Sequence, residues 1–232
     1  MTPAASPRPI PDHIPGSVRR HREYPGSFEA LCAVAPMRTL DPREELFCEG
    51  SRRRDFYQVM TGALLQSRFR GDGSRQILNL ALPGDFLSLP LGDTHNCDVH
   101  ALQQATLRCI PADAIRLAHL HGPGFLQSVC RLLSADVARL QSHMLIIGRP
   151  GATQRVAALL LDLLARQHHD NGNQLPCTIP LSRCDMGELL CISFESVSRA
   201  MTRLKRLGAV KMGDARTIID VRVDRLAEIA SE

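Results

Sequence analysis

Three polar side chains in the last quarter of the chain have the types and the spacing needed to read DNA bases. Glu195, Ser198 and Arg199 occupy positions i, i+3 and i+4, so a helix would place them on one face. In a major groove an arginine can bond guanine through O6 and N7, and a glutamate can accept from the amino group of cytosine. The spacing therefore predicts a set of base contacts to double-stranded DNA.

Other polar residues nearby are suited to the sugar–phosphate backbone, where hydrogen bonds position a protein without reading sequence. We expect backbone contacts from Ser182, Arg183, Ser193, Ser196, Thr202 and Arg203. An ordinary amphipathic helix pair with a solvated polar face is the alternative explanation of the same pattern.

Two short helices joined by a tight turn must position these side chains. Ser182 and Ser193 are expected to be their N-caps, and Asp185 is an acid in the first turn of the first helix, where acids are favourable. The apolar faces are predicted at Met186, Leu189 and Leu190 in the first helix, and at Val197, Ala200, Met201 and Leu204 in the second.

Two residues of this segment stand out. Cys191 lies in the turn, where a glycine would accept a positive φ without steric cost, so we expect backbone strain or a shifted turn. Phe194 lies at the start of the second helix, where it either contacts a thymine methyl group or packs onto the first helix.

Further short elements are expected around the two helices. Apolar runs on either side of Gly213-Asp214 predict a β-hairpin wing. Arg149-Pro150-Gly151 breaks the preceding helix. The predicted elements are a helix at Thr153–His168, a strand at Thr178–Ile179, wing strands at Ala209–Met212 and Thr217–Val221, and a last helix at Val223–Ala230.

The first half of the chain has the composition of short β-strands separated by turns. Gly71-Asp72-Gly73, between two strand-like runs, predicts a hairpin. Many short strands at near-even spacing favour a small antiparallel barrel or sandwich. After a helix at Ser27–Val34, strands are predicted at Phe56–Val59, Ala63–Phe69, Gln76–Leu80 and Ala105–Ile110.

Between the two halves, apolar residues recur alternately at four and three residues, the 3.5-residue period of a coiled-coil seam. The seam consists of Leu126, Cys130, Leu133, Val137, Leu140, Met144 and Ile147. Because polar residues flank this narrow stripe, we expect a homodimeric coiled coil. A helix packed on its own barrel is the alternative.

The composition excludes several classes of protein. Only 4% of the residues are aromatic and none is Trp, which argues against an aromatic-lined sugar or single-strand binder, and the net charge of +4 is compatible with nucleic acid. No apolar run has the ~20 residues of a membrane span, and residues 1–26 lack the apolar core of a signal peptide, so a cytoplasmic protein is expected. The eight cysteines form no C-x-x-C pair, and no nucleophile–base spacing or phosphate-cradling loop indicates an enzyme.

Several short motifs together resemble the CRP/FNR superfamily of transcription regulators, over about residues 27–230. In the first half they are Phe47-Cys48-Glu49-Gly50, Phe56-Tyr57-Gln58-Val59, Thr61-Gly62-Ala63 and Leu82-Pro83-Gly84-Asp85. In the second half, Glu195-Ser196-Val197-Ser198-Arg199 matches the recognition sequence E-x-x-S-R. The resemblance implies an α+β fold: a cyclic-nucleotide-binding-type β-roll, a dimerisation helix and a winged helix-turn-helix. It also implies a homodimer on a TTG…CAA palindrome, read by Glu195, Ser198 and Arg199 and placed near RNA polymerase.

Residues 1–26 are rich in Pro and Arg without periodicity, which predicts an extended or disordered arm. The change of pattern along the chain and the helix break then give the β-roll (27–122), the dimerisation helix (123–148) and the DNA-binding domain (149–232). The dimer contacts are expected at Leu126, Leu133, Val137, Leu140, Met144 and Ile147.

Two sets of ligand-binding residues that define branches of the superfamily are absent from this sequence. Thr94-His95-Asn96-Cys97 stands where cyclic-AMP binders carry Arg-Ser, and residues 1–31 contain no cysteine for an iron–sulfur cluster. No cofactor is therefore expected, and the chain resembles FixK-type regulators of oxygen-limited respiration, nitrogen fixation or denitrification. The alternative is a regulator whose β-roll binds a small molecule or haem, with candidate ligands at His95, His100, His119, His121 and Met60.

Cys184 is a candidate redox switch. It falls in the first turn of the first helix beside Arg183, and helix N-termini and neighbouring cations favour thiolates. Oxidation there would add bulk, and eventually negative charge, next to the DNA backbone. The alternative is a thiol with no regulatory role.

Overall fold

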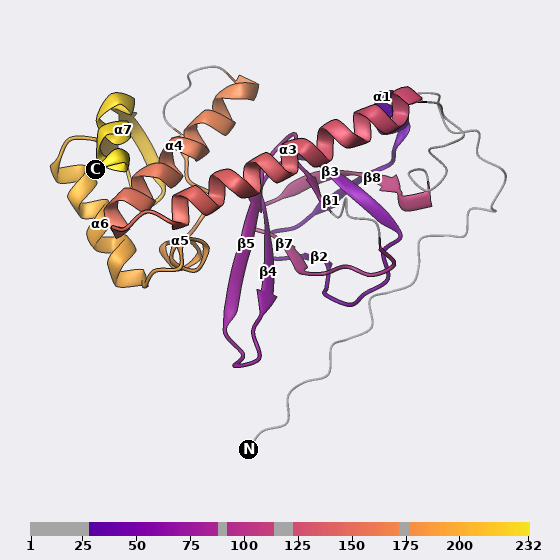
Figure 1. Ribbon diagram of the computed structural model, residues 1–232, viewed down its shortest axis with the longest axis horizontal. Coiled ribbons are helices and arrows are strands. Elements are labelled where there is room, and N and C mark those ends of the chain that lie inside the picture. Colours follow the sequence, from indigo (N-terminus) through magenta and orange to yellow (C-terminus); the bar gives the residue numbers. More distant parts are fainter. Residues whose placement is uncertain (1–27, 88–91, 114–122, 172–176) are drawn as a thin grey trace.

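The computed structural model describes residues 28–87, 92–113, 123–171 and 177–232. Figure 1 shows a β-rich part, a long helix that passes along it, and a helical part at the other end of that helix. The arm predicted for residues 1–26, together with His119 and His121, lies outside the described residues.

Two antiparallel sheets of four strands each form the β-roll in the described residues, with orders β1-β8-β3-β6 and β2-β7-β4-β5. An apolar core that includes Leu64, Val99 and Leu107, all fully buried, lies between them. The strands are β1 Met37–Leu40, β2 Glu45–Phe47, β3 Asp55–Thr61, β4 Leu64–Phe69, β5 Arg75–Ala81, β6 Phe86–Leu87, β7 Asp98–Ala101 and β8 Ala105–Pro111.

The four strands predicted from the sequence are β3, β4, β5 and β8, within two residues at each end. The prediction missed β1, β2, β6 and β7. These strands have two to four residues, too few to show a repeating alternation, and β1 buries only Leu40.

The outer face of the first sheet is covered by α1 (Phe28–Val34) and by α3 (Pro123–Ile147). Three aromatic rings pack against one another where these elements meet. The Phe28 ring centroid lies 6.1 Å from that of Phe56 on β3 and 5.7 Å from that of Phe125 on α3. The helix predicted at 27–34 is therefore present, and it closes one side of the roll.

One face of α3 packs on the chain itself and the predicted seam lies on another face. Phe125, Val129 and Ile146 are buried at 7% exposure or less. Five of the seven seam residues have exposures from 36% at Leu133 to 67% at Met144. Leu126, Val137 and Leu140 lie between these values, Cys130 is exposed and Ile147 is half-buried.

The C-terminal part is a winged helix arrangement. The helix break predicted at 149–151 lies between α3 and α4. The third strand beside the wing is at Cys177–Thr178, one residue before its predicted place. The elements are α4 Ala152–Asn171, β9 Cys177–Thr178, α5 Arg183–Leu190, α6 Phe194–Arg206, β10 Val210–Met212, β11 Thr217–Val221 and α7 Val223–Ser231.

A buried carboxylate joins the roll to both long helices. Asp85, 7% exposed, belongs to the Pro83-Gly84-Asp85 turn, and its Oδ2 accepts the backbone N–H of Leu82 at 2.9 Å. Its Oδ1 lies 3.0 Å from Nη1 of Arg139 on α3, and its Oδ2 pairs with Arg166 on α4. The ion pairs hold α3 and α4 at fixed places on the roll. In the described residues no helix is long and apolar enough to cross a membrane.

Candidate nucleic-acid interface

The first helix of the pair, α5, begins with a reciprocal cap. Ser182 has the extended conformation of an N-cap, its hydroxyl accepts the N–H of Asp185 at 3.1 Å, and the Asp185 carboxylate accepts the N–H of Ser182 at 3.2 Å. Both orphan backbone donors are thus satisfied. The predicted cap is present, and the predicted apolar face, Met186, Leu189 and Leu190, is buried.

The turn between α5 and α6 is left-handed at Cys191, with φ 55° and ψ 43°. The strain expected from a residue with a Cβ is therefore located there. Sequence reasoning missed a second constraint at Gly187, where a Cβ would lie 2.8 Å from the carbonyl oxygen of Ile192. Only glycine allows α5 to approach the turn this closely, and no periodicity in the sequence signals it.

The recognition face of α6 is formed as predicted from spacing. Val197, Ala200, Met201 and Leu204 are buried, while Glu195 and Arg199 are exposed and Ser198 is half-buried. The pKa of Glu195 is lowered by its own backbone N–H, then by the Ser193 hydroxyl and Arg199. The carboxylate therefore stays ionised and can accept from a base amino group.

Three of the predicted backbone-contacting residues lie at the exposed start and middle of α6. The Ser193 hydroxyl caps the helix by accepting the N–H of Ser196 at 3.2 Å. The Ser196 hydroxyl in turn accepts from Nη2 of Arg199 at 3.4 Å, and Thr202 donates to the carbonyl of Ser198 at 3.0 Å. Arg203, one turn after Arg199, is exposed as well.

Arg183, for which a DNA backbone contact is predicted, is bonded to the wing in this structure. Its Nη2 donates to the carbonyl of Ala215 in the wing at 3.0 Å, and its Nη1 lies 3.5 Å from Sδ of Met186. The guanidinium thus holds the wing against α5. Cys184 is exposed in the first turn of α5.

The wing hairpin, β10 and β11, is closed by a side chain. Asp214 accepts the backbone N–H groups of Arg216 at 2.7 Å and Thr217 at 2.8 Å, and these bonds lower its pKa. Phe194, at the other side of the recognition face, is 49% exposed and lies outside the buried core. The exposed half of this ring lies at the start of α6, where a partner can contact it.

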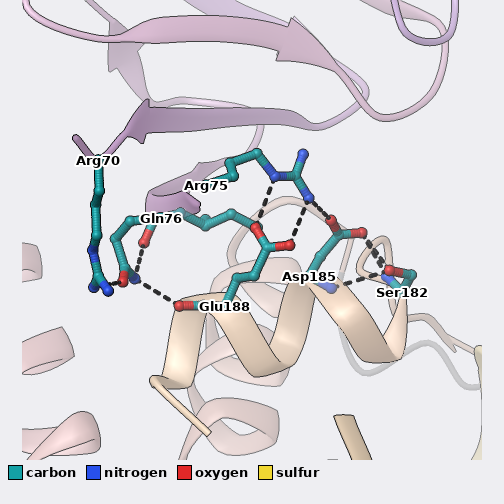
Figure 2. A network of polar contacts seen from close by, with 7 residues as sticks. Arg70, Arg75, Gln76, Ser182, Asp185 and Glu188 are labelled. Atoms are coloured by element: carbon teal, nitrogen blue, oxygen red, sulfur yellow. Dashed lines mark hydrogen bonds and ion pairs between the residues drawn. The ribbon is translucent and has the colours of Figure 1, made fainter. Parts of the chain in front are cut away.

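A polar clamp connects the β4–β5 hairpin of the roll to α5, as Figure 2 shows. Nε of Arg75 lies 2.7 Å from Oε2 of Glu188, and its Nη2 lies 2.7 Å from Oδ1 of Asp185. Gln76 beside it donates to the carbonyl of Glu188 at 2.6 Å. Sequence reasoning missed this clamp because its partners are 110 to 113 residues apart.

We expect Arg75→Gln to loosen α5 from the roll by about 1–3 kcal/mol, because two half-buried carboxylates lose their cation. Faster native-state hydrogen exchange of the α5 amides measures this. Arg68→Gln is the matched control, since Arg68 on the same hairpin pairs with Glu49, an exposed residue of the roll itself. If the two substitutions speed the exchange of the α5 amides equally, the clamp does not hold α5 on the roll.

His95 does not replace the arginine of a cyclic-nucleotide site. His95 is 4% exposed and its ring is stacked on Phe47, with centroids 3.7 Å apart. Burial, then the charge of Arg53, lowers the pKa of His95 to about 4, so it is neutral and cannot stand in for an arginine. A cavity of about 30 Å³, which Asn79, Arg139 and His143 help to line, lies between the roll, α3, α4 and α5. In the described residues no three His, Cys, Asp or Glu side chains are grouped to hold a metal ion.

A β-roll, a long connecting helix and a winged helix-turn-helix with an exposed polar recognition face define a DNA-binding regulator of transcription. The pattern of a cyclic nucleotide-binding domain matches residues 37–118, and that of a Crp-like helix-turn-helix domain matches residues 154–229.

The chain is 34% identical to the nitrogen fixation regulation protein FixK of Rhizobium meliloti, over 83% of this chain and 86% of that protein. It is 31% identical to FixK of Bradyrhizobium diazoefficiens, over 79% of this chain and 78% of the relative. Among solved structures, FixK2 from Bradyrhizobium japonicum matches with a TM-score of 0.76 and 29% identity, over 84% of this chain and 97% of that one. The chain belongs to the CRP/FNR superfamily of transcription regulators and is of the FixK type.

Proposed function

We propose that the chain is a homodimeric transcription activator that binds a TTG…CAA palindrome, one half-site per subunit. The observation that carries this proposal is the exposed recognition face of α6, on which Glu195, Ser198 and Arg199 stand together and Glu195 is held ionised. In this arrangement the N-terminal turns of α6 enter the major groove and the caps of α5 and α6 lie at the phosphates.

The exposed seam of α3 supports the homodimer. Leu126, Val137, Leu140 and Met144 are 46–67% exposed along one stripe, and burying such a stripe against a second copy is favourable. A two-fold pair then presents two recognition helices to a palindrome. In this proposal residues 27–122 form the β-roll domain, 123–148 the dimerisation helix and 149–232 the DNA-binding domain.

The FixK relatives support a role in nitrogen fixation or oxygen-limited respiration. Two more distant relatives, AadR of Rhodopseudomonas palustris and FnrL of Cereibacter sphaeroides, are described as transcriptional activators. Activation would work by contact with RNA polymerase beside the bound site, in the cytoplasm where the chromosome lies.

Selection of bound DNA from a random pool by the full chain tests the proposal. Enrichment of an inverted repeat with TTG and CAA halves is expected. An enriched single half-site would exclude the dimer, and the absence of any enriched sequence would exclude specific reading by α6.

We also infer that oxidation of Cys184 weakens DNA binding. The thiol is exposed at the start of α5, next to the Ser182 cap that this arrangement places at the phosphates. Peroxide is expected to reduce the affinity of the unsubstituted chain at least several-fold, and Cys184→Ala is expected to bind normally and resist peroxide. Cys191→Ala, at another exposed thiol, is the control and should stay sensitive. If Cys184→Ala loses binding under peroxide to the same extent, the inference is wrong.

A further inference from the structure

A cavity of about 360 Å³ opens on the outer face of the first sheet, between that sheet, α1 and α3. Its size is within the 300–1,000 Å³ range of small-molecule sites. It is separate from the roll core and from the recognition face, and the clamp of Figure 2 takes no part in it. Of the contacts described above, it shares only the Phe28 ring of the aromatic cluster.

The floor of the cavity is one row of side chains across three neighbouring strands. Gln58 on β3 is paired in register with Phe86 on β6 and with Arg108 on β8. Side chains at paired positions point to the same side of a sheet. Oε1 of Gln58 is buried and has no hydrogen-bond partner among the described residues. A buried acceptor without a partner is costly, and turning the amide over would point its N–H₂ at an acceptor on a bound molecule.

The described lining of the cavity carries a net positive charge. Arg108 on the floor and Arg131 on α3 have no ion pair or hydrogen bond from their guanidinium groups in the described residues. Glu29 at the rim is the one carboxylate in the described lining, and it accepts from the Ser128 hydroxyl at 3.1 Å. Burial raises the pKa of the Cys32 thiol to about 11, so this wall of the cavity is neutral.

The remaining walls are apolar. Phe28 is 4% exposed, and Phe86 and Leu132 are partly buried against the same aromatic cluster. We propose that this cavity binds a small organic anion with an apolar body, its acid group between Arg108 and Arg131 and its body against Phe28, Phe86 and Leu132. Two arginines without partners beside an apolar wall fit a carboxylate on a short alkyl or aryl body.

Residues 1–27 of the same chain are a poor occupant by charge. They contain four arginines, Arg8, Arg19, Arg20 and Arg22, against two acids, so their net charge has the same sign as that of the cavity. A separate anion is favoured for that reason. A bound molecule would also contact α3 next to the proposed dimer seam, because Arg131 and Leu132 directly adjoin the seam residues Cys130 and Leu133 in sequence.

Fluorescence of 1-anilinonaphthalene-8-sulfonate, an anion with an aromatic body, reports the site in the full chain. Octanoate should displace one dye molecule per chain and octanol, its uncharged counterpart, should not. Arg108→Gln and Arg131→Gln should each weaken octanoate binding about tenfold. Arg222→Gln, at an exposed arginine of the DNA-binding part, is the matched control and should bind as the unsubstituted chain.

The substitution Gln58→Leu tests whether Gln58 contacts the ligand or only supports the fold, because the two roles predict opposite changes in stability. Removing an unpartnered buried acceptor should raise the melting temperature of the free chain. Removing the amide N–H₂ of the same side chain should weaken octanoate, whose carboxylate can only accept hydrogen bonds. The proposal is overturned if octanol competes as well as octanoate, or if the Arg108 and Arg131 variants bind like Arg222→Gln. It is also overturned if the dye does not bind the full chain, which would mean that the chain's own residues fill the cavity.

Discussion

Arg199→Ala is expected to remove discrimination at one base pair of each half-site, by about 1–3 kcal/mol per contact. The arginine is exposed on the recognition face, and its Nη2 bonds the Ser196 hydroxyl at 3.4 Å, which orients the guanidinium before DNA arrives. Losing a bidentate contact to guanine makes the four bases at that position nearly equivalent. Titrations of the palindrome and of sites substituted at that guanine, at one salt concentration, measure the change.

Arg203→Ala is the matched control for this prediction. Arg203 is exposed on the same helix, one turn further from its start, where we expect a phosphate contact. Its loss should weaken binding to all sequences alike and should reduce the slope of log affinity against log salt by about 1. If Arg199→Ala weakens all sites equally and Arg203→Ala changes the sequence preference, the assigned register of α6 in the groove is wrong.

Val137→Asp is expected to separate the homodimer. Val137 is 53% exposed at the centre of the seam of α3, so the substitution leaves the core of the subunit intact. Across the two-fold axis it places two carboxylates in an apolar contact, where each loses hydration without gaining a cation. We expect monomers at micromolar concentration and a 10²–10⁴-fold loss of affinity for the palindrome, since the second half-site no longer binds intramolecularly. Sedimentation and gel-shift titrations measure the two effects.

Ala138→Asp is the control that tests whether any new charge on α3 separates the homodimer. Ala138 is exposed on the same turn but lies off the seam, so the dimer should persist. Affinity for a single half-site should be unchanged in both variants. A Val137→Asp chain that remains dimeric would show that α3 contacts only its own subunit and that the dimer forms elsewhere.

Local features of the DNA-reading segment could be predicted because each depends on residues close in sequence. An N-cap is set by the residues of the first turn, so Ser182 could be predicted as the cap and Asp185 as a favourable acid from their positions alone. The buried and exposed faces of α6 follow from the 3.6-residue period, which put Val197 inside and Arg199 outside. Strands of six or seven residues were recognisable for the same reason, and strands of two to four were not.

The sequence by itself thus determined the recognition face, its caps, the periodicity of the seam and the membership of the superfamily. Only the tertiary structure decided how the parts are joined. Arg75 meets Glu188 across 113 residues, Asp85 joins two helices to the roll, and Arg183 holds the wing. It also decided that Gln58, Phe86 and Arg108 form one row under α1 and α3. Such contacts arise when distant segments pack, and no local periodicity records which of many surface charges will meet.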